Sequence, residues 1–129
     1  MKHQGKGRLA RQMGGKGAFA EVVLQLEPSK KLSISFDECD ASDRHSDGEI
    51  HYAVAVSFGI RFALEKLTFT ERRLHSYDVR VLCIHTMVVD STESFVAYAA
   101  AKAVYAALGR TDEPIEFDIE RRAIILARW

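Results

Sequence analysis

The fold is decided around residues 10–22, ARQMGGKGAFAEV, which hold three of the chain's eight glycines within four positions. Glycine adopts the positive φ angles of tight turns, so Gly14, Gly15 and Gly17 predict a turn between two strands. A nucleotide-binding P-loop is excluded by spacing, because its first glycine falls on Ala10 and its Ser or Thr falls on Gly17. A β-pattern follows the glycines, so no helix N-terminus would face a phosphate.

Two interpretations of the glycine turn remain open. It is either a plain hairpin turn, or a surface loop whose backbone and Lys16 approach RNA phosphate. The charge distribution bears on this choice, although the formal net charge of the chain is zero. Residues 1–17 contain five basic residues and no acidic one, whereas residues 18–47 contain seven acidic residues. This asymmetry is typical of a local anion contact or of two solvated segments that partly neutralise each other.

The remaining elements follow from hydrophobic periodicity. Strands are expected at 6–13, 18–27, 31–37 and 76–89, and a final strand at 114–127. The turn at 28–30 predicts a hairpin between 18–27 and 31–37. A capping box at 46–49 predicts a helix that runs to about Leu67, and an alanine-rich helix is expected from Ser91 to Leu108, with Gly109 ending it. Its small side chains would let this second helix lie close against the sheet, so we expect it to be central to the core. The mixture favours an α+β fold with both helices packed on one face of a mixed sheet.

The sequence gives little support for a catalytic site or a metal-binding site. His85 stands near Asp90 and Ser91, but nearness within one strand-turn-helix segment does not make a nucleophile, a base and an orienting acid converge. The two cysteines, Cys39 and Cys83, lack metal-ligand spacing, and Cys83 lies in an apolar strand pattern with Tyr77, Val79 and Val81 on its face. We expect no catalytic residue, no metal, no cofactor and no small-molecule substrate. Without an apolar leader or membrane segment, a cytoplasmic protein is expected.

Three segments, taken together, resemble domain IV of the elongation factor G and elongation factor 2 family. The first, GKGRLARQMGGKGAFAEV at 5–22, matches the family at Gln12, Gly14, Gly15, Lys16, Gly17 and Phe19. The second, YAVAVSFGIRFAL at 52–64, matches at Tyr52, Ala55, Val56, Gly59, Ile60 and Leu64. The third, VDSTESFVAYAAAKAV at 89–104, matches at Val89, Asp90, Ser91, Glu93, Ala99 and Ala100. Their order and spacing cover nearly the whole chain, so residues 1–129 are expected to form one such domain.

The resemblance implies a split β-α-β fold with a four-stranded mixed sheet, two helices on one face and a left-handed crossover. In that family the domain enters the decoding region of the ribosome, with a tip built from the glycine loop and the loop before the V-D-S segment. The implied partner is the ribosome or its RNA, and a separate GTPase or another protein is a further candidate partner. The implied contact residues are Arg8, Arg11, Gly14, Gly15, Lys16, Gly17, His85, Thr86 and Met87.

The second tip loop departs from the family pattern, because Met87 stands where the family carries a histidine. An alternative function is therefore a protein-interaction module that kept the fold and lost RNA contact. Under both hypotheses the chain is a non-catalytic module.

Overall fold

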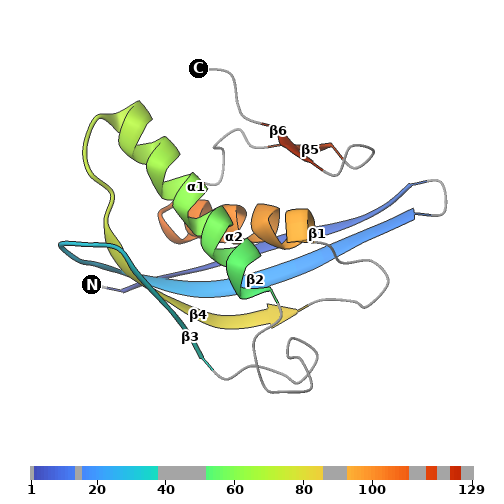
Figure 1. Cartoon of the computed structure of the whole chain (residues 1–129), viewed down its shortest axis with the longest axis horizontal. Helices are drawn as coiled ribbons and strands as arrows, with labels where there is room; N and C mark the ends of the chain where they lie inside the picture. Colours follow the sequence, from blue (N-terminus) through green and yellow to red (C-terminus); the bar gives the residue numbers. More distant parts are fainter. Residues whose placement is uncertain are drawn as a thin grey trace.

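The computed structural model describes residues 2–13, 16–37, 52–85, 93–110, 116–118 and 123–125. Two helices cover one face of a four-stranded mixed sheet, with a small two-stranded sheet beside them (Figure 1). The α+β fold expected from the sequence is thus confirmed. The elements in chain order are β1 His3–Met13, β2 Lys16–Pro28, β3 Ser33–Phe36, α1 Ala53–Glu71, β4 Tyr77–His85, α2 Glu93–Ala107, β5 Glu116–Asp118 and β6 Ala123–Ile125.

The glycine turn joins β1 and β2 as an antiparallel hairpin. Met13 pairs with Lys16, and the register runs without interruption to His3 and Leu26. Lys16 and Gly17 therefore belong to β2, not to the loop in which the sequence pattern placed them. Gly14 and Gly15 lie outside the described residues.

The hairpin predicted between 18–27 and 31–37 is wrong. The strand order is β1-β2-β4-β3, so β4 lies between β2 and β3, and β3 runs parallel to β4. β2 continues to Pro28 and a bend follows at Lys30 and Lys31, while the amide of Ser29 donates a hydrogen bond to the carbonyl of Ser76, just before β4 (3.1 Å). Apolar-polar alternation in residues 31–37 defined which face is buried, but it carries no information about which strand is the neighbour.

The connection between β3 and β4 is the left-handed crossover that the resemblance implied. In Figure 1 the chain leaves β3 toward the right, returns through α1 over the near face of the sheet, and enters β4, which lies above β3. Crossovers between parallel strands are right-handed in nearly all proteins, so this handedness is a distinguishing feature of the fold.

In the core, α2 packs directly against β1. Gly5 and Gly7 are buried in β1, and a Cβ at either position would overlap backbone atoms of α2, at Ala103 and Ala99 respectively. The alanines of α2 make this approach possible because they keep the helix backbone near the sheet. The expectation that the alanine-rich helix is central to the core is therefore confirmed.

A β-bulge changes which side chains of β4 face the core. Val23 pairs with Cys83 and Leu24 pairs with Val81, so Leu82 is the extra residue between two successive pairs. The extra residue shifts the alternation. As a result Ile84 is fully buried and Cys83 is only half-buried, which reverses the faces that alternation predicted for these two residues.

Some predicted boundaries differ from the structure. α1 begins at Ala53 and extends to Glu71, beyond the predicted end at Leu67, and the proposed capping box at 46–49 lies outside the described residues. α2 ends at Ala107, and Gly109 follows with a positive φ of 74°, as a helix-ending glycine requires. The single strand predicted at 114–127 is instead two short strands, β5 and β6, paired antiparallel. The apolar pattern between them is interrupted by Arg121 and Arg122.

Candidate functional site

The β1–β2 hairpin projects beyond the rest of the sheet. Among the described residues, β4 pairs with β2 only from Glu21 to Pro28, so within this part of the chain the section of β2 nearer the turn pairs with β1 alone. Figure 1 shows the two strands continuing past the end of β4 and past both helices. We call this two-stranded extension, residues 10–13 and 16–19, the β1–β2 arm. Its backbone carries Arg11, Lys16 and Gly17, three of the residues expected to contact RNA.

A row of polar side chains crosses the sheet at the base of the arm. Arg8 on β1 pairs with Glu21 on β2, and Glu21 pairs with His85 on β4. Their positions in the alternation place all three on the sheet face opposite the helices. The structure thus brings together Arg8 and His85, which the sequence predicted as contact residues, and it inserts Glu21 between them.

Glu21 reduces the positive charge at the base of the arm. Its carboxylate lies 3.7 Å from Nζ of Lys6 and 3.9 Å from Nε of Arg8. Sequence reasoning did not include Glu21 in the site. The sequence pattern predicts a turn of four residues, 14–17, which does not place Glu21 opposite Arg8. A predicted turn of two residues, 14–15, would have given the register in which they pair.

Phe19 adds an aromatic surface to this row. The guanidinium carbon of Arg8 lies over the Phe19 ring, 5.6 Å from its centroid, and Phe19 is half-buried. Such a cation–π contact orients the guanidinium while leaving its outer edge available to an anion. Phe19 was matched to the family pattern but was not among the predicted contact residues.

His85 has a second close neighbour on its own strand. The Sγ of Cys83 lies 2.9 Å from Nε2 of His85, because residues i and i+2 of a strand share a face. The expected contact residues Thr86 and Met87, together with Gly14 and Gly15, lie outside the described residues. Within the described residues no cluster of three or more His, Cys, Asp or Glu side chains could hold a metal ion.

Farther from the arm, Arg80 on the open sheet face is paired with an acid. Nε of Arg80 donates a hydrogen bond to Oδ1 of Asp37 at 2.6 Å, and this hydrogen bond raises the pKa of the Arg80 guanidinium. Asp78 accepts a hydrogen bond from the Ser33 hydroxyl. The open face is therefore electrostatically mixed, and the excess of basic residues over acidic ones is found in the arm.

A solved protein shares this fold. The crystal structure of a protein from Thermus thermophilus matches it with a TM-score of 0.62 and 25% sequence identity, over 79% of this chain. This chain spans 15% of the length of that protein. No protein-family model matches the sequence, and no curated protein sequence matches it.

Among the described parts of the chain, neither helix combines the length and the apolar composition that a membrane span requires.

Proposed function

We propose that this protein is a non-catalytic, translation-related module that binds the ribosome or structured RNA through the β1–β2 arm. We also propose that the chain is related to domain IV of elongation factor G and that the protein is located in the cytoplasm. The observation that carries it is the projection of a basic two-stranded arm beyond the body of the fold.

The shape and charge of the arm suit contact with a phosphate backbone. Protein–nucleic acid affinity depends mainly on Lys and Arg contacts to phosphates, together with backbone N–H groups. The arm lacks acidic residues along its whole length, and the first acid on β2 is Glu21 at its base. A narrow two-stranded extension can enter a cleft that the helix-backed body could not.

The Thermus thermophilus protein that shares this fold is much longer, because this chain spans only 15% of its length. We propose that the module acts beside other translation components. In this proposal a separate GTPase supplies the energy-dependent step, and the module supplies recognition.

Ribosome co-sedimentation at low salt tests the proposal. The wild-type protein should pellet with ribosomes, and the double variant Arg11→Glu/Lys16→Glu should bind about tenfold more weakly or worse, because two phosphate contacts become repulsive. The matched control is Lys30→Glu/Lys31→Glu, which reverses two charges in the exposed turn between β2 and β3. Equal loss in both double variants would point to net charge alone, and absence of wild-type binding at low salt would refute the proposal.

A second candidate is a protein-interaction module without RNA contact. The position of Glu21 favours it, since this carboxylate offsets Lys6 and Arg8 at the base of the arm. Affinity capture from lysate separates the two candidates. A specific protein partner retained after nuclease treatment supports the second candidate, whereas partners that all disappear with nuclease support RNA binding.

A further inference from the structure

The outward side of α1 carries an unusual number of exposed apolar side chains. Val54 is 84% exposed, Phe58 is 58% exposed and Phe69 is 70% exposed. Together with Arg61, Phe62 and Glu65 they recur at helical spacing, so all six lie along one side of the helix. We call this set the α1 stripe. Contiguous exposed apolar surface of this kind marks an interaction site in soluble proteins.

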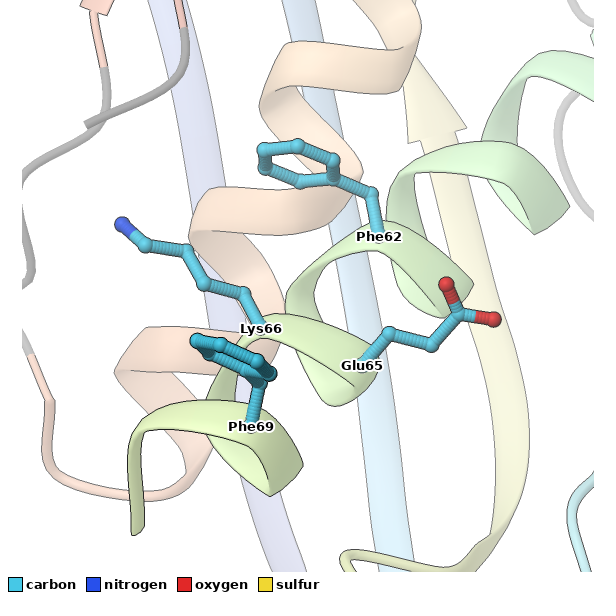
Figure 2. A pocket seen from close by; sticks show the side chains of 4 residues that line it. All are labelled: Phe62, Glu65, Lys66 and Phe69. Carbon is cyan, nitrogen blue, oxygen red and sulfur yellow. The ribbon is translucent and has the colours of Figure 1, made fainter. Parts of the chain in front are cut away.

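The stripe contains a hollow that could receive a large side chain. A cavity of about 670 Å³ is lined by Phe62, Glu65, Lys66 and Phe69. Figure 2 shows Phe62, Lys66 and Phe69 projecting toward one edge of the stripe, with Glu65 directed toward its other edge. Lys66 is buried, and its ammonium lies 6.0 Å from the centroid of the Tyr105 ring on α2. The hollow therefore lies along the phenylalanine edge of the stripe, with the two rings on either side of Lys66.

The charges of the stripe are complementary to those of the α1 stripe in a second copy that runs in the opposite direction. Arg61 and Glu65 are both exposed, stand one helical turn apart, and form no ion pair among the described residues. When two copies of α1 are placed antiparallel about a twofold axis near residue 63, Arg61 of each copy faces Glu65 of the other. An interface between identical copies requires this kind of reciprocal pairing.

We propose that the α1 stripe is a homodimer interface in which two copies of this chain pack α1 against α1 in antiparallel orientation. The same axis places Phe58 of each copy opposite residue 68 of the other, beside Phe69 and over the hollow. The ring would then fill the hollow as a knob fills a hole in helix packing. The two Arg61–Glu65 pairs lie beside the twofold axis, and the two Phe58 contacts lie outside them along the helices.

A second copy fits the stripe better than a partner of one charge sign would. The stripe presents one cation and one anion among apolar side chains, so neither a strongly acidic nor a strongly basic surface complements it. The zero net charge of the chain also removes long-range repulsion between copies. The interface is independent of the proposed RNA contact, because its residues lie on the helix layer and the arm belongs to the sheet.

Sedimentation velocity across micromolar to millimolar concentration, with a charge-swap series, tests the interface. The wild-type protein should shift from monomer to dimer as concentration rises. Arg61→Glu and Glu65→Arg should each weaken the dimer about tenfold, because each places like charges together. The double variant Arg61→Glu/Glu65→Arg restores opposite charges across the axis and should dimerise like the wild type. Phe58→Ser should abolish the dimer.

Lys30→Glu is the matched control, because Lys30 is exposed between β2 and β3 and lies outside the stripe. Thermal melts by circular dichroism establish that each variant is folded. A wild-type protein that stays monomeric throughout the range would overturn the proposal. A dimer that neither single charge reversal weakens, or that the double swap fails to restore, would also overturn it, because a different face would then form the contact.

Discussion

At the scale of single residues, Glu71 joins three elements of the fold. Nε2 of His75 donates a hydrogen bond to Oε1 of Glu71 at 2.9 Å, and Arg110 donates to Oε2 through Nε and Nη2 at 2.9 and 2.7 Å. The His75 side chain is 1% exposed, and its Nδ1 lies 3.3 Å from the Tyr77 hydroxyl. Both ring nitrogens are therefore satisfied, and the ends of α1 and α2 are connected to the start of β4.

This cluster determines the protonation of Glu71. Desolvation raises the pKa of Glu71, but hydrogen bonds from His75 and Arg110, with the charge of Arg110, outweigh it and hold the pKa below its ordinary value of 4.5. A carboxyl with a lowered folded-state pKa stabilises the protein at pH values above its unfolded-state pKa. That stabilisation is lost as the pH falls through the folded-state value.

We predict that Glu71→Gln destabilises the protein by about 1–2 kcal/mol at neutral pH, because charge-assisted hydrogen bonds are replaced by neutral ones. The difference from wild type should be constant above about pH 5 and should shrink as the pH falls below about 4.5. Urea unfolding as a function of pH measures it. Glu27→Gln, at an exposed position of β2, should show little effect at any pH. A pH-independent deficit in Glu71→Gln would contradict the assigned role of the carboxylate.

At the scale of elements, β1 and α2 can lie in close contact because the buried glycines of β1 have no side chains. Gly7 is buried in β1, and a Cβ there would overlap the carbonyl oxygen of Ala99 and the amide nitrogen of Ala103. Backbone atoms of a helix cannot move aside as a flexible side chain can. The separation of helix and sheet is therefore set by the glycines of β1 and the alanines of α2.

We predict that Gly7→Ala costs about 3 kcal/mol or more, since it forces α2 away from the sheet and overpacks the core. Chemical denaturation measures the loss. The same substitution at Gly109, where a Cβ would meet nothing within 4 Å, should cost only about 1 kcal/mol through its positive φ of 74°. Equal costs at the two positions would mean that backbone entropy, and not the close approach of α2, explains Gly7.

At the scale of the whole molecule, the basic arm and the neutral body are separate regions. Because the net charge is zero, the RNA binding that we propose would come from the local excess of cations in the arm and not from a general positive field. Local phosphate contacts have a measurable signature. Each one contributes about 0.7–0.9 to the slope of log affinity against log salt concentration.

We predict that Arg11→Gln/Lys16→Gln lowers this slope by about 1.5, as expected for two lost phosphate contacts. Fluorescence anisotropy with a labelled RNA hairpin from the small-subunit decoding region, titrated at several salt concentrations, provides the measurement. Lys30→Gln/Lys31→Gln removes the same charge at the β2–β3 turn and should leave the slope unchanged. If both pairs lower the slope equally, the arm is not the preferred contact.

The sequence by itself determined the features that depend on neighbouring residues. The glycines predicted the β1–β2 hairpin, Gly109 predicted the end of α2, and the alanines predicted a helix held close to the sheet. These features are local because turn conformation, helical periodicity and side-chain size act within a few residues. The resemblance added the handedness of the β3–β4 crossover, which periodicity does not contain.

Only the tertiary structure decided the features that join distant segments. β3 bonds to β4 instead of to β2, because backbone pairing is available to any strand and its partner depends on the whole sheet. The bulge at Leu82 reverses Cys83 and Ile84, and the register across three strands inserts Glu21 between Arg8 and His85. The arm projects for the same reason, since β4 ends its pairing at Glu21 while β1 and β2 continue. Pairing between strands is non-local, so one-dimensional alternation predicted the strands but could not place them beside each other.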